Sequence, residues 1–440
     1  MGLESPQVPP GRLEERFTDK APALSPTEAQ HEANRCLYCH DAPCIPRCPT
    51  SIDIPTFIRK IATGNLRGAA RTILESNLLG ASCARVCPVE VLCESTCVYE
   101  SWGRPAIPIG RLQRHAMTAG ASPDLLPSAA PSGHSVGLVG AGPASLACAG
   151  TLALMGHRAV IYEKRSLSGG LNSTGVAPYK MRLDAALSEV EFITSLGVEI
   201  ETDVEVGVDV TAEELLERHE AVFLGPGLGP DSTLPVPGAD GAGVVGAVEW
   251  IERVKVEPHF DLGDVAAAVV IGGGNTALDA AQELRGLGVR DVSMIYRRSA
   301  AEMSGYAHEL SGARAAGTVL VENAAVVEVV RDGEHVTGVR LEECEDGRPT
   351  GRDRGTVPTG LVVLAIGQAK LRELAGLFDG VECDDRGRLI ADEASGVTGN
   401  PRVFAGGDAR NGGREVVNAV AEGQAAARSI DARLRGGGNA

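Results

Sequence analysis

The chain has 440 residues, a length that suits two or three domains, and 43% of them are hydrophobic, enough for ordinary globular cores. Its net charge of −17 argues against nucleic acid as a main partner, because an acidic surface repels backbone phosphates. The sequence has no stretch of 18 uncharged apolar residues, so we expect no membrane span and no membrane partner.

Residues 1–30 are rich in proline and charged side chains and are expected to form an extended N-terminal arm. The first 20 residues lack the apolar stretch of a secretory signal peptide. We therefore expect a cytoplasmic protein, and disulfides rarely persist in that reducing compartment. Clustered cysteines in such a chain are expected to bind metal.

Residues 31–120 contain eight of the chain's 11 cysteines, in two groups of four. The first group is Cys36, Cys39, Cys44 and Cys48, and the second is Cys83, Cys87, Cys93 and Cys97. Thiolates at this close spacing converge on one inorganic cluster, and a Cys-Pro ending is typical of bacterial ferredoxins. Two structural zinc sites would use the same eight residues. The Cys-Pro endings and the redox domains that follow favour iron–sulfur clusters.

The same region is expected to be α-helical, because residues 54–76 carry apolar side chains at helical spacing, with a break near Gly64. A linker rich in Pro, Ser and Gly follows at 121–133. The cysteines beyond it, Cys148, Cys344 and Cys383, are isolated and are expected to be small buried hydrophobes.

After the linker, a strand, a glycine loop, a helix and a second strand follow one another twice, at 134–164 and at 266–298. Each is a βαβ unit, so we expect an α/β protein with two Rossmann-like domains in a disulfide-reductase-like arrangement. Strand-then-glycine segments at 221–230 and 361–368 are expected to mark the crossings between the two domains. The expected boundaries are 134–238 and 365–440 for the first domain and 239–364 for the second.

The first glycine loop predicts an FAD site. Gly140 permits a tight turn, Gly142 lets the backbone approach a pyrophosphate, and Ser145 is small enough for helix–strand packing. Glu163 ends the second strand and is expected to accept hydrogen bonds from a ribose hydroxyl. The complete predicted site is Gly140, Gly142, Pro143, Ala144, Ser145, Glu163, Lys164, Gly170, Leu171, Gly407, Asp408, Val416, Val417 and Asn418. Its last three residues begin a C-terminal helix whose N-terminus is expected to point at the flavin ring.

The second glycine loop predicts a nicotinamide nucleotide site. Its second strand ends in Arg297 and Arg298 rather than in an acid, and arginine suits a 2′-phosphate. NADPH is therefore favoured over NADH. The predicted site consists of Gly272, Gly274, Asn275, Thr276, Arg297, Arg298, Ala365, Ile366 and Gly367.

The chemistry expected of these two domains is hydride transfer from nicotinamide to flavin. That step needs stacking and orientation more than a proton-transferring side chain, so we assign no catalytic acid or base. The chain has no closely spaced cysteine pair after residue 97, which disfavours a thiol–disulfide reaction. The electrons are expected to leave through the iron–sulfur clusters.

At this point the chain resembles the iron–sulfur flavoproteins that include the N-terminal half of dihydropyrimidine dehydrogenase and the small subunit of glutamate synthase. The segments CLYCHDAPC, GASCARVCPVEVLCESTC and IPIGRLQRHA are most similar to the separate small subunit of bacterial NAD-dependent dihydropyrimidine dehydrogenase. The resemblance covers about residues 31–430. It implies an α-helical domain with two 4Fe–4S clusters, followed by the FAD and nicotinamide domains.

The resemblance also implies a ligand set. Cys36, Cys39, Cys44 and Cys97 would hold one cluster, and Cys48, Cys87, Cys93 and Gln113 would hold the other. Cys83 would then not be a ligand, although spacing alone cannot separate it from the other cysteines.

The expected function is that of an electron-input subunit. NAD(P)H would reduce FAD, and the clusters would pass electrons to an FMN-containing catalytic partner, itself expected to carry iron–sulfur clusters, in a hetero-oligomer that reduces uracil or thymine. One alternative is a glutamate synthase-type small subunit or a free-standing NADPH:acceptor reductase. Another, from a different class, is a zinc-stapled nucleotide-binding scaffold.

Overall fold

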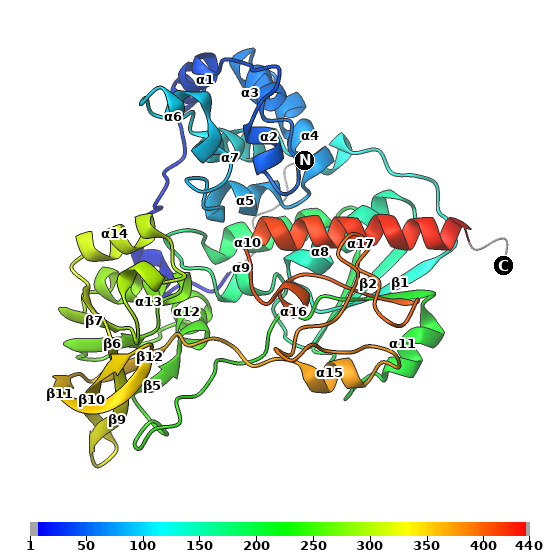
Figure 1. Cartoon of the computed structure of the whole chain (residues 1–440). Helices are drawn as coiled ribbons and strands as arrows, with labels where there is room; N and C mark the ends of the chain where they lie inside the picture. Colours follow the sequence, from blue (N-terminus) through cyan, green and yellow to red (C-terminus); the bar gives the residue numbers. More distant parts are fainter. Residues whose placement is uncertain (1–7, 437–440) are drawn as a thin grey trace.

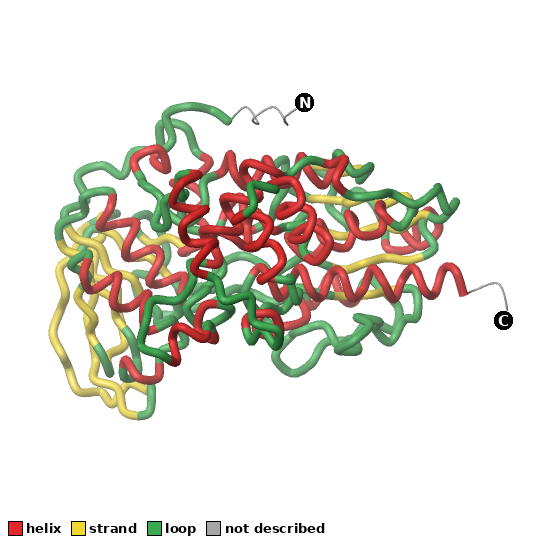
Figure 2. Tube along the Cα trace, turned by 90° about the horizontal axis from the view of Figure 1, so that it is seen from above, coloured by secondary structure: helices red, strands yellow, loops and turns green. Residues whose placement is uncertain are grey.

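The structure is a computed structural model that describes residues 8–436. It contains one helical domain and two α/β domains, as predicted (Figure 1). Seen from above in Figure 2, helices occupy the middle of the molecule, and the strands of the second α/β domain gather at one end. No helix within the described residues is both long and apolar enough to span a bilayer.

The helical domain contains short helices joined by tight turns. They are α1 (Pro26–Arg35), α2 (Cys44–Arg47), α3 (Ile54–Ala62), α4 (Leu66–Ser76), α5 (Gly80–Val86), α6 (Val98–Ser101) and α7 (Ile109–Gly120). The predicted break lies between α3 and α4, where Gly64 has a φ of +78°. Helix α1 begins five residues before the boundary expected at residue 31, because Ser25 and Glu28 form a capping box around its first turn.

The N-terminal segment is docked rather than free. Residues 1–7 of the predicted arm lie outside the described residues. Leu13 opens the short helix η1 (Leu13–Arg16) and is buried in the core of the second α/β domain. Glu14 accepts a hydrogen bond of 3.0 Å from the amide of Leu183, and Asp19 pairs with Arg114 of the helical domain at 2.6 Å. The arm therefore contacts all three domains.

The first α/β domain is built on a five-stranded parallel sheet with the order β13-β4-β1-β2-β3. Its strands are β1 (Ser135–Val139), β2 (Arg158–Glu163), β3 (Glu199–Thr202), β4 (Ala221–Leu224) and β13 (Val403–Ala405). Its helices include α8 (Pro143–Leu154), α9 (Leu171–Thr174), α10 (Leu183–Thr194), α11 (Ala212–Arg218), α15 (Arg372–Gly376), α16 (Asp408–Asn411) and α17 (Val416–Gly436). Helix α17 lies along α8 (Figure 1), and Gly423 permits this because any Cβ there would overlap the carbonyl of Ala144.

The second α/β domain repeats this plan with the order β5-β12-β6-β7-β8. Its strands are β5 (Val244–Gly246), β6 (Ala267–Ile271), β7 (Asp291–Ile295), β8 (Val319–Val321) and β12 (Leu361–Leu364), and its helices are α12 (Ala247–Val256), α13 (Asn275–Gly286) and α14 (Ala307–Ala315). A three-stranded antiparallel sheet, which the sequence analysis did not predict, is inserted before β12. It comprises β9 (Ala324–Asp332), β10 (His335–Glu345) and β11 (Arg348–Pro358).

The two crossings between the α/β domains lie where the strand–glycine segments predicted them. The chain leaves the first sheet after β4 and leaves the second sheet after β12, and the two connections then pair. The amide of Gly229 donates to the carbonyl of Ala369, and the amide of Ser232 donates to that of Gly367, both at 2.9 Å. The domains are thus joined by a short two-stranded connection.

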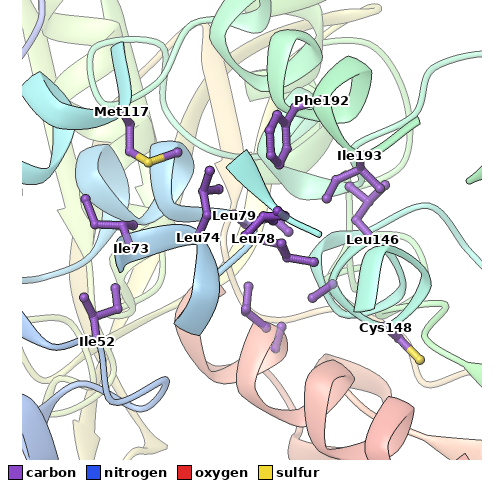
Figure 3. Close-up of a cluster of buried hydrophobic side chains, with 14 of the residues drawn as sticks. Ile52, Ile73, Leu74, Leu78, Leu79, Met117, Leu146, Cys148, Phe192 and Ile193 are labelled. Atoms are coloured by element: carbon purple, nitrogen blue, oxygen red, sulfur yellow. The ribbon is translucent and has the colours of Figure 1, made fainter. Parts of the chain in front are cut away.

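The helical domain shares a core with the first α/β domain. Figure 3 shows Leu74 and Leu79 of the helical domain on the side of Leu146 and Ile193 of the α/β domain. Each of these side chains is at most 2% exposed. The common core fixes the cysteine-bearing helices relative to helix α8.

The isolated cysteines lie in the α/β domains. Cys148 and Cys344 are buried as predicted, with 0% and 4% exposure. Cys383 is only half-buried, so the prediction was wrong for this residue; it lies in an irregular segment that covers one edge of a core cluster.

Candidate functional site

The first thiol group in the structure lies at the outer end of the helical domain and consists of Cys36, Cys39, Cys44 and Cys97, with Cys97 in the place that spacing gave to Cys48. Cys36 follows α1, Cys44 begins α2 and Cys97 precedes α6 (Figure 1). Burial, together with negative charge on Cys36, Cys97 and Cys39, raises the pKa of Cys44 to about 12. Burial and the charges of Cys39 and Cys97 raise the pKa of Cys36 in the same way. The four residues that the resemblance assigns to one cluster therefore lie together.

The second thiol group lies at the end of α5 and consists of Cys83, Cys87, Cys93 and Cys48, so Cys48 takes the place that spacing gave to Cys97. A hydrogen bond with Cys83 raises the pKa of Cys87 well above its usual value, and burial and the charges of Cys83, Cys93 and Cys48 add to this. Burial also raises the pKa of Cys93, with contributions from the charges of Glu94, Cys48 and Cys44. Since Cys44 belongs to the first group, the two groups are neighbours.

Spacing and resemblance give different fourth ligands for this second group: spacing indicates Cys83, and the resemblance implies Gln113. Cys83 contacts Cys87 and accepts a hydrogen bond of 3.3 Å from Asn77 Nδ2. Gln113 is buried, but its Nε2 donates to the carbonyl of Gly80 at 2.7 Å, at the opposite end of α5 from Cys87. The geometry thus brings Cys83 to the group more closely than Gln113, and the assignment of Gln113 stays a prediction.

The donor chemistry fits a metal cluster. Thiols with raised pKa values do not ionise readily by themselves, whereas metal coordination deprotonates a thiol outright. Two adjacent sets of four thiols are the ligand type that iron–sulfur clusters use. Across the part of the chain that the structure describes, no set of three or more His, Cys, Asp or Glu side chains is arranged to hold a single metal ion.

The first glycine loop has the backbone geometry expected for a dinucleotide. Gly140 has a φ of +85°, and a Cβ there would lie 2.9 Å from the carbonyl oxygen of Gly225. Gly170 has a φ of +55°, and its Cβ would lie 2.7 Å from the Cα of Gly142. The loop before α8 and the turn before α9 therefore meet backbone to backbone, where neither glycine can be replaced without strain.

Glu163 holds this loop in place. Its carboxylate accepts hydrogen bonds from the amides of Ala141 at 2.7 Å and Arg165 at 2.9 Å. The residue is buried at the end of β2, whereas the neighbouring Lys164 is exposed. The predicted contact of Glu163 with a ribose hydroxyl stays a prediction.

The C-terminal part of the predicted FAD site closes on the same loop. Gly407 has a φ of +70° and donates its amide to Glu422 at 2.7 Å. Burial raises the pKa of the adjacent Asp408, which accepts a hydrogen bond from Arg414. The other residues predicted here are placed as follows: Pro143, Ala144 and Ser145 in the first turn of α8, Leu171 at the start of α9, and Val416, Val417 and Asn418 in the first turn of α17.

The second glycine loop has similar backbone geometry. Gly272 has a φ of +147°, and a Cβ there would overlap the carbonyl of Ala365, which follows β12. Gly274 caps α13, and Asn275 Oδ1 accepts a hydrogen bond of 2.9 Å from the amide of Tyr306. The remaining predicted residues surround this loop: Thr276 in the first turn of α13, Arg297 and Arg298 after β7, and Ile366 and Gly367, both exposed, after β12.

The structure also contains polar contacts between domains near these loops that were not predicted from the sequence. Tyr306 Oη donates to Glu415 Oε1 at 2.7 Å, just before α17. Lys180 pairs with Asp279 at 2.7 Å and with Glu309 at 2.9 Å. Each pair joins segments about 100 or more residues apart, so no local spacing in the sequence could have indicated it.

Comparisons with known proteins agree with this division of the chain. Residues 13–123 match the domain described as dihydropyrimidine dehydrogenase domain II, 4Fe–4S cluster. Residues 134–423 match pyridine nucleotide-disulphide oxidoreductase. The two matches fall on the helical domain and on the paired α/β domains.

Individual proteins give the same result. The chain is 34% identical to the NAD-dependent dihydropyrimidine dehydrogenase subunit PreT of Escherichia coli K12 over 94% of this chain and 96% of that protein. It is 31% identical to the glutamate synthase [NADPH] small chain of the same organism over 97% and 96%. Among solved structures, Mycobacterium tuberculosis FprA in complex with NADPH matches with a TM-score of 0.55 and 21% identity, over 69% of this chain and 85% of that one, a likeness of fold.

Together these findings support an electron-transferring oxidoreductase that uses FAD, NAD(P)H and 4Fe–4S iron. The related PreT and glutamate synthase chains are named as parts of larger enzymes. The chain belongs to the pyridine nucleotide-disulphide oxidoreductase family, as a member in which a 4Fe–4S domain of the dihydropyrimidine dehydrogenase type precedes the two nucleotide-binding domains.

Proposed function

We propose that the chain is the electron-input subunit of a dihydropyrimidine dehydrogenase. In this proposal NAD(P)H delivers hydride to FAD, and two 4Fe–4S clusters pass single electrons to an FMN-containing partner that reduces uracil or thymine. The bound flavin supplies the conversion from a two-electron hydride to one-electron steps. The chain's own residues hold and orient the two nucleotides and bring the thiols close to them.

One observation carries the proposal: the second thiol group lies beside the junction of the two nucleotide-binding loops. The charge of Cys87 contributes to the raised pKa of Tyr306, after burial and the contact with Glu415. Tyr306 in turn contacts Asn275 of the second loop and Glu415, which precedes α17. A cluster held there would be next to the helix terminus that is predicted to face the flavin ring.

The order of the two thiol groups supports a relay. The group around Cys87 follows α5, which packs against α10 and α17 of the first α/β domain. The group around Cys36 and Cys97 lies farther out, near α1 and α6 (Figure 1). Electrons entering at the first α/β domain would thus reach the inner group first and leave from the outer one toward a partner.

A glutamate synthase-type small subunit is the second candidate, supported by the 31% identity to the glutamate synthase [NADPH] small chain. The two candidates share the chemistry within this chain and differ in the partner. Co-purification of the chain with its partner, followed by assays of NAD(P)H oxidation, separates them.

The test begins with anaerobic purification and analysis of iron, sulfide, zinc and flavin. About eight irons and one FAD per chain, with FAD reduced by NADPH, are expected. Oxidation of NAD(P)H that depends on uracil or thymine supports the first candidate, whereas dependence on glutamine and 2-oxoglutarate supports the second. Two zinc ions and no iron would refute both.

A further inference from the structure

We propose that Tyr306 is a positioning residue: its hydrogen bond to Glu415 holds the nicotinamide nucleotide domain against the flavin domain in the arrangement required for hydride transfer. This inference rests on the proposed transfer of hydride between the two domains. It concerns a contact that no glycine loop or cysteine motif indicates.

Tyr306 is placed to act on both nucleotide sites. It precedes α14, and its amide donates to Asn275 Oδ1 at 2.9 Å, in the first turn of α13. Its hydroxyl donates to Glu415 Oε1 at 2.7 Å, and Glu415 directly precedes α17. One residue thus links the loop predicted to hold the nicotinamide nucleotide with the helix terminus predicted to face the flavin.

The ring of Tyr306 is itself supported from the third domain. It stacks on His308 with a centroid distance of 5.6 Å and an interplanar angle of 8°. His308 Nε2 lies 3.7 Å from Glu90 Oε2, in the loop between Cys87 and Cys93. The helical domain, the flavin domain and the nicotinamide domain therefore meet around this side chain.

The hydroxyl can only act as a donor toward Glu415. Burial and the neighbouring carboxylate raise the pKa of Tyr306, so the phenol stays protonated at neutral pH. A hydrogen bond to an ionised carboxylate is stronger than one between neutral groups. This bond therefore favours the closed arrangement of the two domains over arrangements in which they separate.

Other contacts keep the interface folded when this bond is removed. Lys180 of the flavin domain pairs with both Asp279 and Glu309 of the nicotinamide domain. The arm residue Lys20 adds a pair with Glu309 at 2.7 Å. Tyr306→Phe is thus expected to loosen the orientation of the domains without unfolding either one.

The experiment compares Tyr306→Phe with the wild-type holoprotein. We expect the rate of flavin reduction by saturating NADPH, followed anaerobically by stopped-flow absorbance, to fall about tenfold, the size of one charge-assisted hydrogen bond. The dissociation constant of NADP+ should change less than twofold, because the nucleotide loop is intact. If Tyr306 served only in folding, its loss would not lower the rate of flavin reduction while leaving the dissociation constant of NADP+ nearly unchanged.

A matched control and a conservative variant sharpen the test. Tyr162→Phe removes a phenol that contacts His219 within the flavin domain, and it should leave the reduction rate unchanged. Glu415→Gln keeps an acceptor and should retain most of the rate, whereas Glu415→Ala should behave like Tyr306→Phe. The double variant Tyr306→Phe with Glu415→Ala should be no slower than either single variant, because both remove the same interaction.

Hydrogen–deuterium exchange of the holoprotein gives a second readout that does not depend on turnover. Exchange at residues 303–315 and 412–420 should rise in Tyr306→Phe and stay unchanged in Tyr162→Phe. A wild-type rate together with wild-type exchange, or additive losses in the double variant, would overturn the inference. If wild-type protein shows no reduction of flavin by NAD(P)H, the proposed function fails, and the exchange comparison alone decides whether Tyr306 holds the domains together.

Discussion

Glu189 of helix α10 accepts a hydrogen bond of 3.1 Å from the backbone amide of Ser82 on helix α5. The same carboxylate accepts hydrogen bonds from the amide of Ala81, at 2.9 Å, and from the hydroxyl of Ser82. These amides belong to the first turn of α5, where a helix has no internal acceptors for its N–H groups. A residue of the flavin domain thus caps the helix that leads to Cys87.

Removing this carboxylate is expected to destabilise the helical domain. Glu189→Ala leaves the buried amide and hydroxyl of Ser82 and the half-buried amide of Ala81 without their acceptor, which costs about 1–3 kcal/mol in the free energy of unfolding. Glu189→Gln keeps one oxygen acceptor and should cost less. Thermal unfolding followed by circular dichroism measures the difference, and equal midpoints for Glu189→Ala and the wild type would contradict the assigned role.

The stability should also depend on pH through Glu189. Burial raises its pKa from about 4.5 to about 6, against the hydrogen bonds from Ser82 and Ala81 that lower it. The folded protein therefore binds this proton more tightly than the unfolded chain does. The resulting stabilisation is complete below about pH 4.5 and is lost as the pH rises through about 6. Between these values the wild-type unfolding midpoint should fall relative to that of Glu189→Gln, and parallel pH profiles would disprove the assignment.

Iron content distinguishes the two possible fourth ligands of the cluster that we propose for the inner thiol group, the one around Cys87. If the assignment of Gln113 is right, Cys83→Ala should keep about eight irons per chain, whereas Gln113→Ala should lose up to four. If Cys83 is the ligand instead, as its spacing and its hydrogen bond with Cys87 indicate, Cys83→Ala should lose iron. Cys148→Ala is the control, since Cys148 is fully buried in helix α8 of the first α/β domain and belongs to neither predicted ligand set, so this variant should keep all the iron.

The N-terminal arm is predicted to stabilise the nicotinamide domain through Leu13. Leu13 is 7% exposed and packs in a core with Trp250 and Ile251 of helix α12. Leu13→Ala should lower the free energy of unfolding of this domain by about 2–3 kcal/mol, the lower part of the usual range for a buried leucine. Urea unfolding followed by tryptophan fluorescence measures the loss. Val208→Ala, at a residue 75% exposed, should cause none, and an equal effect of the two variants would show that the arm is not part of the core.

The sequence was most informative where structure is determined locally. Both βαβ units were predicted because a glycine with positive φ, such as Gly140 or Gly272, leaves a clear signal beside a buried strand. The clustering of the eight cysteines was also evident from their spacing, but spacing placed Cys48 and Cys97 in each other's group, and only the resemblance implied their exchange. The sheet of β9, β10 and β11 was not predicted, because its outer strand is largely exposed and carries few apolar residues.

Contacts between distant segments were beyond the reach of sequence patterns. Glu14 is 169 positions from Leu183, and Tyr306 is 109 from Glu415, so neither pair creates a period or a motif. The fourth ligand of the proposed inner cluster is a similar case, because Cys83 and Gln113 lie on two packed helices, and spacing in the sequence does not show which of them lies nearer to the other thiols. These tertiary contacts are the ones that arrange the three domains around the predicted cofactors.

The preference for NADPH can be tested at the end of strand β7. Arg297 is exposed there, and Arg298 lies against the turn between β10 and β11, where a Cβ on Gly347 would be 3.2 Å from its side chain. Guanidinium groups so placed would pair with a 2′-phosphate, which NADH lacks. Replacing both arginines by alanine should raise the dissociation constant of NADPH about tenfold or more and change that of NADH less than twofold, as measured by fluorescence titration.

Arg290→Ala, at the opposite end of β7, is the control and should alter neither constant. Equal losses for the two nucleotides would mean that the arginines contact a part common to both, and the preference for NADPH would lose its basis.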